Sequence, residues 1–203
     1  MLRYSSLYPN HVHQLTVCAS KHYYVTRDGR LKYQHKPMEI RLDNVTQDER
    51  THLVHYLLRD HYSGLFFAEV ATSDRLMPVE QFLARAWSRK SDCVFCGIPD
   101  LLAVPMTVEA FFPTVRKSVA ELGIRFLEVT SGFQAGVRDI RTVEGYVALA
   151  CGEPIENASL RASQITRVNA ERKSSHGLED KASLWLGRVP PVRLPPERWG
   201  REA

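Results

Sequence analysis

The stretch that decides the fold lies between residues 52 and 71. There HLVHYLLRD (52–60) and GLFFAEVA (64–71) flank the short polar segment HYS (61–63). Both flanking segments are almost continuously apolar and have the length of a strand, which predicts two strands buried on both faces near the centre of a sheet. Gly64 favours the turn between them, because glycine tolerates backbone angles that other residues avoid.

The residues before this pair predict more strands. Residues 11–19 partly alternate between apolar and polar side chains, as a strand does. Asp28-Gly29 separates an aromatic and β-branched run from residues 31–33, which is a strong hairpin signal. Residues 34–51 are polar and are expected to form a loop.

The residues after the pair alternate between helical and strand patterns. The expected elements are a helix over 79–87 that begins after Pro78, a strand at 101–104, a helix over 108–122 that Pro113 interrupts, a strand at 124–129 and a helix over 137–150. This order predicts an α/β domain over residues 1–150, with a sheet that begins antiparallel and continues parallel. Residues 151–203 lack this periodicity and contain Pro and Arg, so we expect an extended C-terminal tail.

Composition narrows the class of protein. The 203 residues are 44% hydrophobic and 25% charged, as in ordinary globular proteins. No apolar run is long enough to span a membrane and the first residues lack a secretory signal, so we expect a cytoplasmic protein without membrane contact. The formal charge of +4 permits contact with an anionic polymer but does not require it.

Three short motifs, taken in order, resemble the catalytic core of DDE-type integrases and transposases. PNHVHQLT (9–16) resembles the opening strand of that family, LRDHYSG (58–64) resembles its turn between the second and third strands, and GIPDLL (97–102) resembles the lead into its fourth strand. The likeness spans residues 9–150. It implies the RNase H-like fold of retroviral integrase, which is a mixed five-stranded sheet flanked by helices in three layers. It also implies a link to DNA integration and recombination by mobile elements.

The family's chemistry depends on three carboxylates that hold two Mg²⁺ ions for phosphoryl transfer. Carried over position by position, these carboxylates fall on Thr16, Pro105 and Arg138. A threonine offers only a neutral oxygen, a proline offers no side-chain ligand, and an arginine places a cation where metal ions belong. The resemblance therefore implies a pseudoenzyme with no catalytic residue, no bound metal and no cofactor.

An alternative is a divergent active integrase or transposase that binds Mg²⁺ through displaced carboxylates. The candidate acids are Glu69, Asp100, Glu109, Asp139 and Glu144. In either case the resemblance implies possible partners: DNA, an active recombinase subunit and a second copy of the chain in a homodimer.

Candidate residues for nucleic-acid binding are Arg138 and Arg141, three apart on the last helix, with Arg125 expected beside them on the neighbouring strand. With the acids gone, these arginines could contact phosphates directly. The plainer alternative is a solvated helix face.

The remaining cysteine, histidine and tryptophan residues suggest structural roles. Cys93 and Cys96 form a C-x-x-C pair, but no second pair at suitable spacing completes a zinc site, so we expect buried or half-buried thiols. The histidines, at 11, 13, 52 and 55, are expected at the surface or at strand edges. Trp185 and Trp199 would anchor the tail, either to the core or to a partner.

Overall fold

The computed structural model describes residues 5–174 and 179–200 and has a central mixed sheet. The strand order is β4-β3-β1-β5-β6, and β2 adds to one end of β1. The strands are β1 (Val12–Val25), β2 (Leu31–Tyr33), β3 (Thr51–Asp60), β4 (Phe66–Thr72), β5 (Leu101–Pro105) and β6 (Arg125–Val129). Strands β2 and β3 pair antiparallel with β1, and β4 with β3, whereas β5 and β6 continue the sheet in parallel. The predicted α/β sheet is confirmed.

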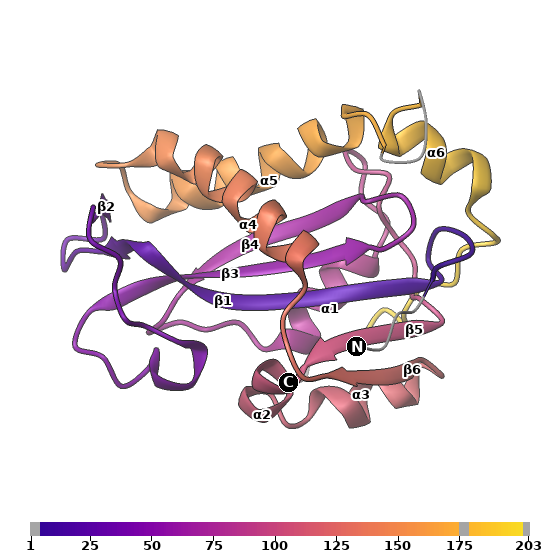
Figure 1. Cartoon of the computed structure of the whole chain (residues 1–203), viewed down its shortest axis with the longest axis horizontal. Helices are drawn as coiled ribbons and strands as arrows, with labels where there is room; N and C mark the ends of the chain where they lie inside the picture. The colour runs from indigo at the N-terminus through magenta and orange to yellow at the C-terminus, as the bar shows by residue number, and fades with distance from the viewer. Residues whose placement is uncertain (1–4, 175–178, 201–203) are drawn as a thin grey trace.

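Helices cover both faces of this sheet. They are α1 (Val79–Trp87), α2 (Met106–Phe111), α3 (Val115–Glu121), α4 (Gln134–Val147), α5 (Ile155–Glu171) and α6 (Lys181–Arg188), with short 3₁₀ turns η1 (Leu42–Asn44) and η2 (Ala148–Ala150). In Figure 1, α4 crosses in front of β1 and β3, and α5 runs along the β4 edge. Helix α1 lies behind the sheet, which gives three layers.

Two apolar cores fill the spaces between these layers. Because successive strand residues point to opposite faces, Leu15 and Leu58 pack toward α1 and Trp87. Their neighbour Leu57 packs toward α4 and α5 instead. The near-continuous apolar character of β3 is therefore explained by burial on both faces, as predicted.

The expectation of an extended tail after residue 150 is wrong for residues 155–171 and 181–188, which form α5 and α6. Helix α5 buries a stripe of mostly small residues against β4 and α4, which comprises Ala158, Ala162, Ile165, Thr166 and Asn169. Alanines at helical spacing give a weak hydrophobic signal, so the polar remainder of this segment obscured the pattern. Residues 189–200 follow without a further helix.

The two tryptophans of this region pack onto the chain's own core. Trp185 of α6 is buried. The Trp199 ring lies 5.4 Å from that of Trp87, centroid to centroid, and its Nε1 donates to the Ser118 carbonyl. Of the two alternatives, anchoring to the core is the one that the structure shows.

Other sequence-based expectations need smaller corrections. The strand at 11–19 and the first hairpin strand merge into the single β1, with a bulge between Ala19 and Tyr24. Pro113 divides the expected helix into α2 and α3. The predicted surface or edge positions are wrong for His13, His52 and His55, which are buried, whereas Cys93 is half-buried and Cys96 buried, as expected.

None of the helices in residues 5–174 and 179–200 is long and apolar enough to cross a bilayer.

Candidate functional site

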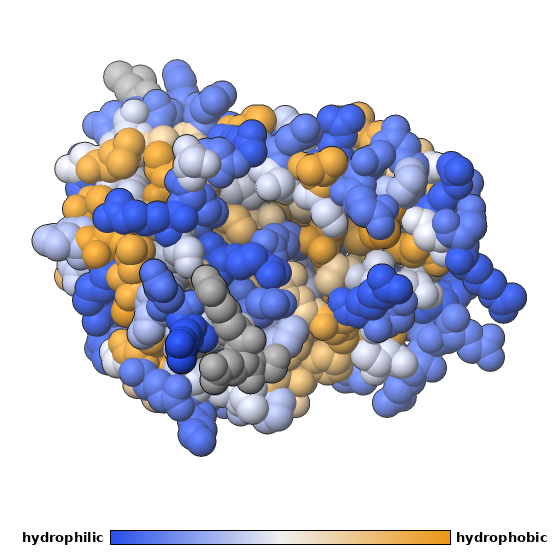
Figure 2. Space-filling view, turned by 180° about the vertical axis from the view of Figure 1, so that it is seen from behind, coloured by the Kyte–Doolittle hydropathy of each residue, from blue (hydrophilic) through white to orange (hydrophobic). Residues whose placement is uncertain are grey.

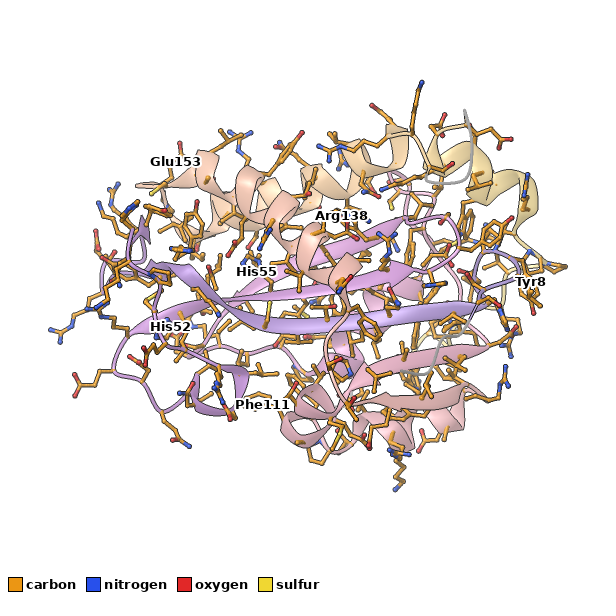
Figure 3. All side chains as sticks on the ribbon, in the orientation of Figure 1. Tyr8, His52, His55, Phe111, Arg138 and Glu153 are labelled. Atoms are coloured by element: carbon orange, nitrogen blue, oxygen red, sulfur yellow. The ribbon has the colours of Figure 1, made fainter. Side chains whose placement is uncertain are left out.

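The structure places Thr16 against the start of α4, and Pro105 ends the strand β5 that pairs with β1. The parallel pairing of β1 with β5 ends at Gln14 and Ala103, two residues before Thr16 and Pro105 respectively. Helix α4 crosses at this point: a Cβ added to Gly136 would lie 2.5 Å from the Thr16 hydroxyl oxygen. Arg138 is two residues further along α4, and Figure 3 shows it above the sheet.

The residues at these positions do not fit a pair of Mg²⁺ ions. The Thr16 hydroxyl is buried and has no hydrogen-bond partner among the described residues. Pro105 contributes no side-chain oxygen, and the Arg138 side chain is 71% exposed with its Nε 4.0 Å from Asp139. Mg²⁺ needs hard oxygen ligands in near-octahedral geometry, whereas here a hydroxyl fills the space against the backbone of α4.

The five displaced acids are held by separate partners in different parts of the fold. Glu69 pairs with Arg85, Asp100 with Tyr8 and Arg193, Glu109 with Arg116, Asp139 with Arg59, and Glu144 with Ser20 and His55. Within residues 5–174 and 179–200, no group of three or more His, Cys, Asp or Glu side chains is arranged to hold a metal ion.

A row of polar side chains, here called the polar stripe, lies on the sheet beneath α4, among residues such as Leu53 and Leu57 that are apolar. It consists of Gln14, Thr16 and Cys18 on β1 with His55 and Arg59 on β3, and the register pairs Gln14 with Arg59 and Cys18 with His55. Its side chains meet polar residues of α4, so this layer is held by hydrogen bonds and charges as well as by apolar packing.

One end of the stripe is a hydrogen-bonded group around Glu144. The Glu144 carboxylate accepts from the Ser20 hydroxyl at 2.6 Å and contacts His55 Nε2 at 3.2 Å. Burial disfavours the charged carboxylate, but the hydrogen bonds and charge of His55 and the Ser20 hydroxyl outweigh it, so the pKa of Glu144 is lowered. Burial, with Glu144 nearby, raises the pKa of Cys18 to about 12, so this thiol is a poor nucleophile.

The other end is the ion pair between Arg59 and Asp139. Their side chains are only 9% and 7% exposed, and Arg59 Nη1 donates to Asp139 Oδ2. Lys181, at the start of α6, extends toward the same place, because a Cβ on Gly64 would contact both Arg59 Nη2 at 2.9 Å and Lys181 Cε at 3.5 Å. The pKa of Lys181 is lowered to about 8, first by burial; Asp139 opposes this, whereas Arg59, Arg172 and Arg138 add to it.

This cluster of cations, formed by Arg59, Arg138, Arg172 and Lys181, differs from the one that the sequence predicted. Arg138 belongs to it, and Arg141 is exposed further along α4. Arg125 does not lie beside them: it begins β6 opposite Leu101, while the other end of β6 faces Pro105 and leads toward α4. Arg172 and Lys181 could not be found from the sequence, because their position depends on α5 and α6.

A second buried polar group lies at the same end of β3 as Arg59, but on the opposite face of the strand, toward α1. The Asp60 carboxylate accepts from the backbone of Asn10 at 2.9 Å and of Ser63 at 2.7 Å, and from the Ser63 hydroxyl at 2.5 Å. Burial nevertheless raises the pKa of Asp60 to about 6 and lowers the pKa of nearby His13 to about 3. His13 accepts from Trp87 Nε1, so a neutral imidazole fits this position.

A cavity of about 800 Å³ opens on the α1 side, between the α1–α3 region and the C-terminal segment. Its lining includes Met77, Phe111, Phe112 and Trp199, with Glu80 below. The Glu80 carboxylate accepts from the hydroxyls of Thr114 and Ser118, so its hydrogen bonds are made within the protein. Figure 2 shows the surface from behind, where apolar and hydrophilic residues are interspersed.

The sheet order, the crossing of α4 over β1 and the helices on both faces define the RNase H-like fold of retroviral integrase cores. The chain is similar to a chain of the simian T-cell lymphotropic virus intasome in complex with the PP2A regulatory subunit B56 gamma, at 16% identity and a TM-score of 0.51. That match covers 95% of this chain but only 60% of the viral one.

Two structures of the HTLV-2 integrase catalytic core domain in complex with magnesium, in trimeric and dimeric forms, are also similar. Their identities are 14% and 13% and their TM-scores 0.48 and 0.47, over 89% of this chain and 99% and 98% of theirs. No family model matches the sequence, and no curated protein matches it.

Proposed function

We propose that this chain is a catalytically inactive integrase-core-like module that binds nucleic acid in DNA integration or recombination. The observation that carries the proposal is the contact between Thr16 and Gly136. It supports the proposal because Thr16, one of the three positions where the resemblance implies a carboxylate, lies against the backbone of α4, and Pro105 and Arg138 likewise supply no carboxylate.

Nucleic-acid binding is supported by the charge near this place. Arg138 and Arg141 are exposed on α4, and Arg172 and Lys181 lie close enough to Arg138 to share its electrostatic environment. Phosphates of a nucleic-acid backbone are the ligands that such arginines bind well.

The catalytic part of the proposal is tested with supercoiled plasmid DNA in Mg²⁺ or Mn²⁺, alongside calorimetric titration of each metal. We expect neither nicking nor saturable metal binding. Cleavage that Glu144→Gln abolishes would overturn the proposal and establish the displaced-carboxylate alternative.

The binding part is tested by gel shift on duplex DNA over a series of salt concentrations. Each lost phosphate contact is expected to reduce the salt slope by about 1, so Arg138→Ala should lower it. The matched control is Arg125→Ala, an exposed arginine at the far end of β6 that should leave the slope unchanged. No binding at low salt would contradict nucleic-acid binding and leave assembly with a recombinase subunit or with a second copy, which light scattering detects.

A further inference from the structure

Arg59, the buried Asp139 and Lys181 lie together where the β3–β4 turn, the end of α5 and the start of α6 come together, and Arg138 and Arg172 are near enough to act on the charge of Lys181. Figure 1 shows these segments at the same end of the molecule, near α6. Backbone hydrogen bonds fix the arrangement: Arg172 N donates to the Asn169 carbonyl, and Lys181 N donates to the Arg172 carbonyl at 2.9 Å.

The single carboxylate does not satisfy these cations. Asp139 is bound by Arg59 Nη1, yet Arg59 Nε is buried and has no hydrogen-bond partner among the described residues. An unpartnered buried N–H of a charged group is costly. It marks a place where an acceptor is missing.

The Lys181 ammonium has no hydrogen bond or ion pair within residues 5–174 and 179–200, although the side chain is half-buried. It extends past Gly64, whose missing side chain leaves room for both Lys181 and Arg59. A Cβ at residue 64 would lie 2.9 Å from Arg59 Nη2 and displace that guanidinium, and the positive φ of 74° favours glycine here in any case.

Two of the acids near this place, Asp180 and Asp60, are already bound. Asp180 accepts from the backbone and hydroxyl of Ser183. Asp60, next to Arg59 in sequence, faces the opposite side of β3 and accepts from Asn10 and Ser63. The local excess of positive charge is therefore not neutralised by these carboxylates.

We propose that Arg59, Arg172 and Lys181, with Arg138 at the rim, form a binding site for a phosphate group. A phosphate offers several acceptor oxygens and a compact negative charge, which match a guanidinium fork and an ammonium converging from different elements. The site deepens the proposed nucleic-acid binding by naming its contacts, but the same chemistry would hold free phosphate.

Inorganic phosphate is the probe that separates these two sources. Isothermal titration calorimetry at low salt should show saturable binding to the full chain. Lys181→Gln and Arg172→Gln should each weaken it about tenfold or more, as expected for the loss of a charge-assisted hydrogen bond. Arg161→Gln is the matched control, because it removes one positive charge from the same helix about three turns away.

A second measurement requires no variant. The ¹³Cε resonance of Lys181 reports its titration, and bound phosphate should move its pKa upward from about 8 toward the ordinary lysine value, whereas chloride at equal ionic strength should not. This measurement keeps the proposal testable if a variant does not fold.

Affinity for a short DNA duplex, measured by fluorescence anisotropy, completes the test. If Lys181→Gln weakens both phosphate and duplex binding, the site takes a backbone phosphate. If it weakens only phosphate binding, the site binds free phosphate: the phosphate site is then supported, while its role in nucleic-acid binding is contradicted. Phosphate binding equal in all three variants, or an unmoved Lys181 titration in phosphate, would overturn the site.

Discussion

The two faces of β1 and β3 differ in what holds the helices against them. Toward α1, the middle of both strands presents apolar side chains such as Leu15, Val17 and Tyr56, and an ion pair, between Arg85 and Glu69, lies at the surface with exposures of 43% and 23%. Toward α4, the same strands present a polar stripe, and the ion pair Arg59–Asp139 is buried. The α1 face is held mainly by close apolar packing, whereas the α4 face also contains a buried ion pair.

The difference teaches which contacts fix the position of each helix. Apolar packing tolerates small changes of volume and shape, whereas a buried charge tolerates loss of its partner poorly. The placement of α4 therefore depends on a few buried polar atoms in addition to its apolar stripe, whereas the placement of α1 depends mostly on apolar contacts. Four predictions test this contrast, from the largest expected effect to the smallest.

Removing the buried charge of α4 should have the largest effect. Asp139→Asn leaves the Arg59 guanidinium buried without its anion, which should lower the free energy of unfolding by about 3 to 5 kcal/mol. Urea denaturation measures it. The double variant Arg59→Met with Asp139→Leu should lose much less, and an equal loss in single and double variants would contradict the role of the pair.

Asp60, the buried acid toward α1, should make stability depend on pH. Its pKa is about 6 when folded and 3.8 in the unfolded chain, so its contribution is fully present below pH 3.8 and is lost as pH rises through 6. The total is about 3 kcal/mol, from two pKa units. The difference in unfolding free energy between Asp60→Asn and the wild type should therefore rise across that window.

The neighbouring His13 titrates in the opposite sense, because burial lowers its pKa to about 3. Stability from this residue is present above its unfolded value of 6.5 and falls on acidification. Because His13 Nε2 lies only 3.9 Å from Asp60 Oδ1, the comparison is made in a His13→Gln background, which removes this slope from both curves. A flat difference between pH 3.8 and 6 would show that Asp60 titrates normally.

Filling the space between α4 and β1 should have a moderate effect. Gly136→Ala places a methyl group 2.5 Å from the Thr16 hydroxyl, and overpacking of this kind lowers the unfolding free energy by about 1 to 3 kcal/mol. Thermal denaturation of Gly136→Ala, Thr16→Ala and the double variant gives the interaction free energy between the two residues. We expect Thr16→Ala to recover part of the loss, and strictly additive losses would show that the two residues do not touch.

Removing the exposed acid of the α1 face should have the smallest effect. Glu69→Gln breaks the pair with Arg85, whose side chain is 43% exposed, and surface pairs contribute only about 0.2 to 1 kcal/mol. Chemical denaturation beside Asp139→Asn gives the direct comparison between an exposed and a buried ion pair. A loss as large as that of Asp139→Asn would remove the contrast between the faces.

Most of the fold could be predicted from the sequence because its strands are long apolar runs. The segments at 52–60 and 64–71 match β3 and β4 closely, and 101–104 and 124–129 match β5 and β6. The failures have physical causes. Alanine-rich α5 has a weak hydrophobic signal, and the polar residues of β1 and β3 hid the burial of His13 and His55.

The site could be predicted only in part. Thr16 lies against the start of α4, and it follows the part of β1 that pairs with β5, the strand that Pro105 ends. The cation cluster could not be foreseen, since Lys181 reaches Arg59 across more than a hundred residues of sequence. Arg125 was misplaced because sequence spacing does not show which end of a strand a helix approaches.

The stacking of Trp199 on Trp87 has a consequence for how the protein is made. A ribosome releases the chain from its first residue, so helix α1 emerges long before the segment that covers one side of its tryptophan. Until Trp199 emerges, one side of the Trp87 indole stays uncovered, and the nascent domain exposes apolar surface of the kind that chaperones bind. Packing around Trp87 is therefore complete only after the segment that carries Trp199 has left the exit tunnel.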